Sequence, residues 1–246
     1  MSGRFLAGNV VVPGPAGKLE AIYKPGDSER TTPRFGAVVC HAHPLHGGTM
    51  HFKLIFRIAR AFDEARAANG PISFLIVNAG IGDSAPFGRT TREAWDRIIA
   101  TNLSAAFDCS QLALPDLLAG EDSRLVFIAS VAGLKGAAYA APYAASKHGL
   151  IGLMRSLAVE FATSNMTVNA ICPSFVDTPM VDDSAARIAS VSKRSPDEAR
   201  QSLAAMNRHG KLIHPDGVAT MILSICLPQS RDVNGAALTI DGGTSA

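Results

Sequence analysis

The chain has 246 residues, of which 47% are hydrophobic and 18% are charged, a balance that excludes intrinsic disorder and allows a large core. Its 23 basic and 21 acidic residues give a net charge of +2, so nucleic acid and anionic membrane surfaces are not expected partners. The four cysteines are widely spaced, as is typical of free thiols in a reducing compartment. No apolar run reaches the roughly 18 residues of a membrane span, and the N-terminus lacks a signal-peptide core. We therefore expect a cytoplasmic protein that does not bind membranes.

The first expected elements form an antiparallel hairpin. Two short apolar runs, residues 9–12 and 19–23, are joined by a Pro- and Gly-rich link too short for a helix. From about residue 35 onward, short aliphatic runs alternate with longer segments of helical periodicity. The expected strands are residues 36–40, 72–77, 125–129, 168–172 and 237–240, and the expected helices are residues 53–68, 91–118, 143–164, 197–206 and 215–227.

This alternation predicts a single α/β domain of three layers, with a Rossmann-like, mostly parallel sheet between helices. We expect the hairpin strands at one edge of the sheet, followed by the other strands in chain order. The polar stretch 181–200 is rich in Ser and Asp, which predicts a mobile element covering the sheet edge. Trp95 shares a helix face with Ile98 and Ile99 and is expected in the core.

Ser130, Tyr143 and Lys147 form the strongest chemical pattern. Tyr143 and Lys147 are four residues apart in an expected helix and so share one face. A nearby ammonium favours the phenolate and lowers a phenol pKa from about 10 toward neutrality. Ser130 ends an expected strand, where ligands of open α/β sheets bind. These groups can move a proton but not a hydride, so a redox cofactor is implied. Taken alone, a Tyr-x-x-x-Lys pair also fits a chance surface pair.

Further motifs surround these residues in a familiar order. Asn78 follows one expected strand, Asn102 lies in an expected helix, and residues 173–178 follow another strand. Over roughly residues 58–246 the chain resembles the short-chain dehydrogenase/reductase family, which implies an NAD(P)-dependent oxidoreductase of a small alcohol or carbonyl substrate. By this resemblance Asn102 anchors a relay water, Ser130 polarises the substrate and Tyr143 is the acid or base. Lys147 holds the cofactor ribose and lowers the tyrosine pKa.

The resemblance also implies cofactor contacts and association. Ser174 stands where the family usually has Gly, and its side chain is expected to crowd the nicotinamide pocket. A homodimer or homotetramer built on the helices at 91–118 and 143–164 is expected. The residues expected to contact NAD or NADP are Asn78, Ala79, Gly80, Tyr143, Lys147, Pro173, Ser174, Val176 and Thr178.

The glycine-rich turn with which this family holds the pyrophosphate is missing from the sequence. Its glycines let backbone N–H groups reach the phosphates at a helix N-terminus. Residues 13–17 follow a strand but lead into another strand, and their prolines lack the N–H donor. We therefore expect weak or absent cofactor binding, because several charge-assisted hydrogen bonds are lost. Residues 47–49 are the remaining candidate phosphate seat.

Residues 5–60 are similar instead to the start of an α/β-hydrolase of the dienelactone-hydrolase-like group. The similarity rests on the preceding hairpin and on the His- and Gly-rich turn of residues 41–48, which in that fold helps to form an oxyanion hole. No Gly-x-Ser-x-Gly nucleophile elbow occurs in the chain, so hydrolase activity is not expected.

Four histidines near the N-terminus are candidate metal ligands. His41, His43, His46 and His51 lie close together without a carboxylate nearby, so a hydrogen-bonded turn is favoured over a metal site.

We interpret the whole chain as a chimera, with a hydrolase-like segment at 1–60 and a dehydrogenase-like segment at 61–246. The two segments would have been joined by recombination, and we favour an engineered origin over a natural one. The function of the chain is then either NAD(P)-dependent oxidoreduction of alcohols and carbonyls or that of a catalytically inactive scaffold.

Overall fold

A five-stranded parallel sheet forms the centre of the protein. The computed structural model describes residues 8–12, 19–23, 37–40, 59–67 and 70–245. The strands lie in the order β3-β4-β5-β6-β7 and every neighbouring pair is parallel, so the predicted order of these five strands is confirmed. Their bounds are Ala37–Cys40 for β3, Phe74–Val77 for β4, Ser123–Ile128 for β5, Met166–Pro173 for β6 and Ala237–Ile240 for β7.

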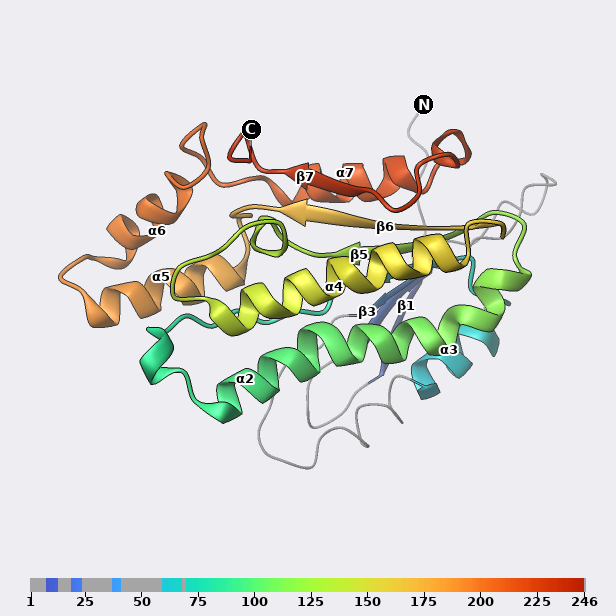
Figure 1. The fold of residues 1–246 in the computed structure, drawn as a ribbon, viewed down its shortest axis with the longest axis horizontal. Helices are drawn as coiled ribbons and strands as arrows, with labels where there is room; N and C mark the ends of the chain where they lie inside the picture. The colour runs from blue at the N-terminus through green and yellow to red at the C-terminus, as the bar shows by residue number, and fades with distance from the viewer. Residues whose placement is uncertain (1–7, 13–18, 24–36, 41–58, 68–69, 246) are drawn as a thin grey trace.

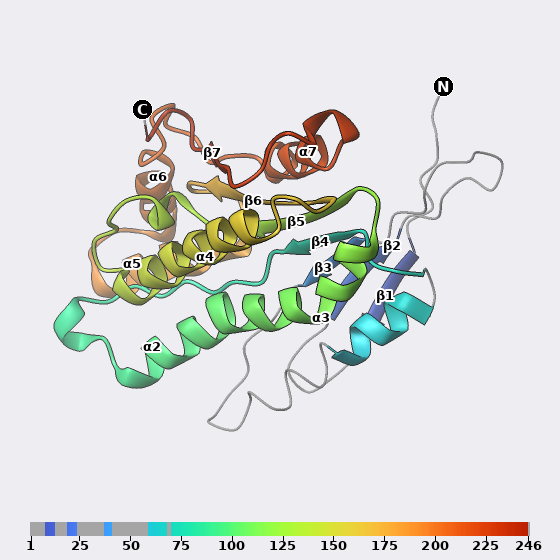
Figure 2. The ribbon, with the colours of Figure 1, turned by 45° about the vertical axis from the view of Figure 1, so that its right-hand side comes forward.

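The two N-terminal strands differ from the expected arrangement. β1 (Gly8–Val12) and β2 (Leu19–Tyr23) pair antiparallel in a two-stranded sheet of their own instead of heading the main sheet. β2 lies beside β3 (Figure 2), but joining a sheet requires a ladder of main-chain hydrogen bonds and not proximity alone. The link at 13–17 and the His-Gly turn at 41–48 lie outside the described residues, so the hydrolase-type origin of this segment stays a prediction.

One long helical run is found where the helix at 91–118 was expected, and its second half packs against one face of the sheet. It consists of α2 (Arg92–Ile99), the π-helical segment η2 (Ala100–Ser104) and α3 (Ala105–Ala119). Residues 59–67 are helical within the expected helix 53–68. The expected helices at 143–164 and 215–227 are α4 (Ala141–Glu160) and α7 (Pro215–Ile225). Three single turns of 3-10 helix complete these elements: η1 (Phe87–Arg89), η3 (Val131–Gly133) and η4 (Pro228–Ser230).

The covering element expected at 181–200 is folded into two helices, α5 (Pro179–Val191) and α6 (Pro196–Ala204). Each begins with a proline at its first turn, a position where the missing N–H costs nothing. Ser195 and Glu198 form a capping box at the start of α6. Val181 and Ala185 of α5 pack against α6 in a small core of their own. The sequence did not predict α5, because most of its residues are exposed and its few buried ones pack against another helix and not against the sheet.

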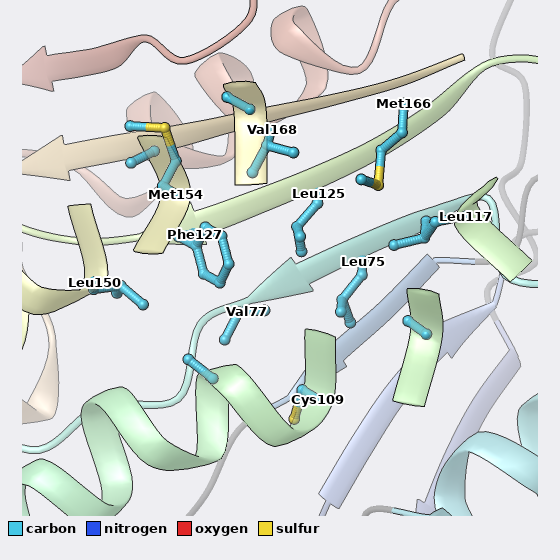
Figure 3. Packing of buried hydrophobic residues seen from close by; sticks show 14 of the residues in the cluster. Leu75, Val77, Cys109, Leu117, Leu125, Phe127, Leu150, Met154, Met166 and Val168 are labelled. Atoms are coloured by element: carbon cyan, nitrogen blue, oxygen red, sulfur yellow. The ribbon is translucent and has the colours of Figure 1, made fainter. Parts of the chain in front are cut away.

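Helices cover both faces of the sheet, as the expected three-layer fold requires. On one face, residues 59–67, α3 and α4 pack against the strands; Leu75, Phe127 and Leu150 lie in this cluster (Figure 3). On the other face, α7 packs against β4, β5, β6 and β7 (Figure 1). Trp95 is 37% exposed on α2, so its expected place in the core is wrong.

The carboxyl ends of the parallel strands define one edge of the sheet. The loops after β4, β5 and β6 all start there, and α5 and α6 lie beyond the tip of β6 (Figure 1). Helix α4 packs against η3, which follows β5. This edge therefore gathers the segments that carry the predicted site residues.

Candidate active site

Asn102 connects two parts of the carboxyl edge. It is fully buried in the π-helical segment η2, a type of distortion frequent at functional sites. Its Oδ1 accepts a hydrogen bond from Ile81 N at 2.8 Å, and its Nδ2 donates to Ile81 O and to Ser146 Oγ, both at 3.0 Å. Ser146 Oγ in turn donates to Tyr143 O at 2.7 Å. Both amide hydrogens of Asn102 are thus used to hold the loop after β4 against α4, and its role as the anchor of a relay water stays a prediction.

Ser130 and Tyr143 interact at the carboxyl edge. Ser130 Oγ accepts from Ala132 N at 3.1 Å and donates to Pro173 O at 3.3 Å. Tyr143 is half-buried, and its burial raises its pKa above the usual value near 10, an effect that the nearby Ser130 hydroxyl opposes in part. The direction is opposite to the expected one, because the loss of solvent outweighs the favourable contacts. With its pKa raised, Tyr143 keeps its phenolic proton at neutral pH.

Lys147 lies under the Tyr143 ring. Only 3% of its surface is exposed, and its Nζ is 5.7 Å from the centre of the ring. Burial lowers the pKa of Lys147 to about 8, with a smaller opposing effect from Cys172. Nζ donates to Ile128 O at 2.7 Å. An ammonium has three donors, so this group can also bind hydroxyls such as those of a ribose.

Glycines bring the backbone close to Lys147. A Cβ on Gly80 would lie 3.4 Å from Lys147 Nζ and 3.6 Å from Asn102 Oδ1. A Cβ on Gly133 would lie 2.7 Å from the main-chain oxygen of Lys147. Only glycine at 133 allows η3 and α4 to approach this closely, which fixes the position of the lysine.

The other expected cofactor residues lie in the loops after β4 and β6. Asn78 is exposed and Ala79 buried directly after β4, and Pro173 is the last residue of β6. Val176 forms a bridge with Ile213, and Thr178 precedes α5 with its Oγ1 donating to Val176 O at 3.3 Å. The loop after β4 meets the first turn of α5, where a Cβ on Gly82 would lie 3.6 Å from Met180 Sδ.

These residues fit the nicotinamide and ribose half of NAD(P). Lys147 offers ammonium donors, and Gly80 has no side chain that would cover the Lys147 Nζ. Ser174 Oγ is buried and has no hydrogen-bond partner in the part of the chain that the structure describes. The candidate phosphate seat at 47–49 lies outside the described residues. The fit therefore concerns one half of the cofactor, and the expected weakness of binding stays a prediction.

Sequence reasoning missed Asp83. Its carboxylate accepts from Arg97 of α2 at 2.9 Å and from Arg187 of α5. A cavity of about 200 Å³ lies beside it and extends to Pro142, the neighbour of Tyr143. No local pattern could have indicated this cluster, because Arg187 is 104 residues away in sequence. Ser146 was also missed, although its place directly before Lys147 put it on the same expected helix, now α4.

The described residues show neither a metal-binding cluster nor a membrane-spanning helix. No group of three or more His, Cys, Asp or Glu side chains is placed to hold a metal within the described ranges. The four N-terminal histidines lie outside those ranges. No helix in the described part of the chain has the length and apolarity needed to cross a bilayer.

Known proteins share this arrangement of strands and helices. The chain is 34% identical to 3-oxoacyl-(acyl-carrier-protein) reductase of Thermotoga maritima over 174 residues, or 71% of this chain and 66% of that protein. It is 36% identical to acetoacetyl-CoA reductase of an Acinetobacter species over 183 residues, or 74% of this chain and 69% of that protein. The chain thus spans about two thirds of the length of these relatives.

A solved structure and a family model agree with these relatives. A variant of actinorhodin polyketide ketoreductase, solved with NADPH, superimposes with a TM-score of 0.74 at 31% identity, covering 77% of this chain and 74% of that one. The family model described as enoyl-(acyl carrier protein) reductase matches residues 56–245, close to the span 58–246 predicted from the motifs. From residue 56 onward, the chain belongs to this family of short-chain dehydrogenases/reductases.

Proposed function

We propose that the protein is an NAD(P)H-dependent ketoreductase that reduces the ketone of a 3-oxoacyl substrate to a hydroxyl group. The observation that supports this most directly is Tyr143, which keeps its phenolic proton, close to Ser130 and over the buried ammonium of Lys147. The relatives named above act on 3-oxoacyl and acetoacetyl groups, which carry a ketone in the same position.

The side chains divide the work of proton transfer. The bound cofactor supplies the hydride. Ser130 orients the substrate carbonyl by a hydrogen bond, and Tyr143 transfers its phenolic proton to the carbonyl oxygen. The Lys147 ammonium stabilises the phenolate that remains. Asn102 acts through its hydrogen bonds to Ile81 and Ser146, which hold the loop after β4 in a fixed position against α4.

The cavity beside Pro142 suits a short acyl group. Ala85 and Ile98 give it an apolar part, while Ser84 and Arg89 give it a polar part. Its volume of about 200 Å³ accommodates a few carbon atoms. We therefore favour a short 3-oxoacyl thioester as the substrate.

A second candidate is a scaffold without turnover. It is favoured by the absence of the glycine-rich turn from the sequence, since that turn supplies much of the dinucleotide affinity. The proposed hydrolase-like origin of residues 5–60, and with it the chimera, concerns residues that mostly precede the family match. Titration with NADH and NADPH, followed by nucleotide fluorescence, separates the candidates: saturation at micromolar concentration supports the enzyme, and none at millimolar concentration supports the scaffold.

The catalytic assignment is tested with Tyr143→Phe. We expect acetoacetyl-CoA reduction to fall by about 100-fold or more, because the proton donor is lost, with nucleotide affinity unchanged. Tyr139→Phe is the matched control, since Tyr139 is an exposed tyrosine in the loop just before α4. Unchanged reduction by Tyr143→Phe would rule out the assignment.

A further inference from the structure

Ser174 carries a hydroxyl that no other group in the described part of the chain binds. Its Oγ is buried and lacks a hydrogen-bond partner among residues 70–245 and the other described segments. The residue as a whole is half-buried, so one side of it borders solvent while the oxygen is turned inward. A buried hydroxyl without a partner is unfavourable, and its presence at a ligand-binding edge calls for an explanation.

The strand geometry shows which face of the sheet this side chain is on. Ala170 N donates to Ala236 O at 2.9 Å, and Ser174 N donates to Ile240 O at 3.0 Å, four residues further along both strands. The alternation of side chains therefore continues through Ser174. Ser174 thus lies on the same face as Ala170 and Cys172, which pack against α4.

Ser174 is also adjacent to the catalytic serine. The carbonyl of the preceding residue, Pro173, accepts the hydrogen bond from Ser130 Oγ. Cys172, two residues earlier, is close enough to Lys147 for each to influence the other's pKa. The unpartnered hydroxyl therefore sits at the carboxyl end of β6, beside the groups that handle the proton.

We propose that the Ser174 hydroxyl hydrogen-bonds to the carboxamide of the nicotinamide ring and so helps to set the position of that ring. This inference rests on the proposed function. Because the residue is half-buried, a rotation about χ1 can turn Oγ from the interior toward the solvent side of the carboxyl edge. The hydroxyl then gains a partner that it lacks in the free protein, so the bond contributes more than one made by a group already hydrated. The alternative, in which the side chain merely crowds the ring, predicts the opposite effect of its removal.

The test is Ser174→Ala in the full chain. We expect dissociation constants for NADH and NADPH, measured by nucleotide fluorescence, to rise about tenfold. Affinity for ADP-ribose, which has no nicotinamide, should not change when measured by calorimetry. Without any nucleotide, the melting temperature should rise by about 2–4 °C, because the unpartnered hydroxyl is gone.

Ser123→Ala is the matched control. Ser123 also has a buried, unpartnered hydroxyl in the described part of the chain, but it begins β5 at the opposite end of the sheet. Its replacement should raise the melting temperature without changing nucleotide affinity.

The outcomes separate this contact from the proposed function. Equal or tighter NADH and NADPH binding by Ser174→Ala overturns the contact, as does an equal loss of affinity for ADP-ribose. Failure of the unaltered protein to bind either nucleotide at millimolar concentration overturns the proposed function, and the contact with it.

Discussion

Lys147 shows how a single buried charge affects both stability and activity. Its pKa in the folded protein is about 8, against 10.5 for a solvated lysine. Below pH 8 the charge is buried at a cost of about 3 kcal/mol. Between pH 8 and 10.5 the unfolded chain binds more protons than the folded one, so this cost is relieved as the pH rises.

Lys147→Met should therefore stabilise the fold and abolish reduction. We expect a gain of about 2 kcal/mol at pH 7, since the loss of the bond to Ile128 O offsets part of the relief. Urea unfolding of both proteins measures it, and the gain should shrink toward pH 10. Lys135→Met, at an exposed lysine, should show no such gain. A destabilised Lys147→Met protein at pH 7 would contradict the argument.

The same titration predicts the pH dependence of carbonyl reduction. Above about pH 8 Lys147 loses the ammonium that stabilises the phenolate, whereas the pKa of Tyr143 is raised and the phenol keeps its proton. The kcat for reduction should be level below pH 8 and should decline above it. A profile that keeps rising to pH 10 would mean that the lysine charge is not required.

At the scale of elements, Asp83 joins the loop after β4 to both α2 and α5. It pairs with Arg97 of α2 and Arg187 of α5. Asp83→Asn should loosen α5 and α6, with amide hydrogen exchange about fivefold faster across residues 179–204, because a partly exposed ion pair contributes up to about 1 kcal/mol. Helix α4 should exchange at an unchanged rate.

Arg92→Gln is the control for that experiment. The ion pair of Arg92 with Asp96 lies within α2 alone, so its loss should not affect α5. Equal exchange of α5 in Asp83→Asn and the unaltered protein would show that α5 is held by its apolar contacts instead.

At the scale of the whole molecule, α3 and α4 carry an exposed surface suited to self-association. Phe107 is 45% exposed beside a hollow that it shares with Leu103, Asp108 and Leu153. Asp108 Oδ2 is buried without a hydrogen-bond partner within the described ranges. A dimer or tetramer through this surface, as the family resemblance implies, stays a prediction.

Phe107→Asp should therefore reduce the molecular mass in solution to that of a monomer, as measured by light scattering. A charge at the centre of an apolar interface removes most of its binding energy. Phe87→Asp is the control, because Phe87 is 79% exposed in η1 and away from this surface. Equal masses for Phe107→Asp and the unaltered protein would exclude this interface.

The sequence by itself determined the parallel sheet, its strand order and the Tyr-Lys pair. Strands such as 125–129 and 168–172 are continuous apolar runs between turn residues, and the spacing of Tyr143 and Lys147 places them on one helix face whatever surrounds them. The strands and the Tyr-Lys pair depend on neighbours in sequence, so local patterns predict them, whereas the strand order follows from the general rule that strands joined by helical crossovers lie side by side in a parallel sheet.

Only the tertiary structure decided the direction of the Tyr143 pKa, the partners of Asn102 and the pairing of α5 with α6. Burial of Tyr143 depends on how several segments close around it. Asn102 is 21 residues from Ile81 and 44 from Ser146, distances at which no periodic pattern exists. Desolvation and long-range hydrogen bonds arise when the chain is packed, and for that reason they leave no local trace in the sequence.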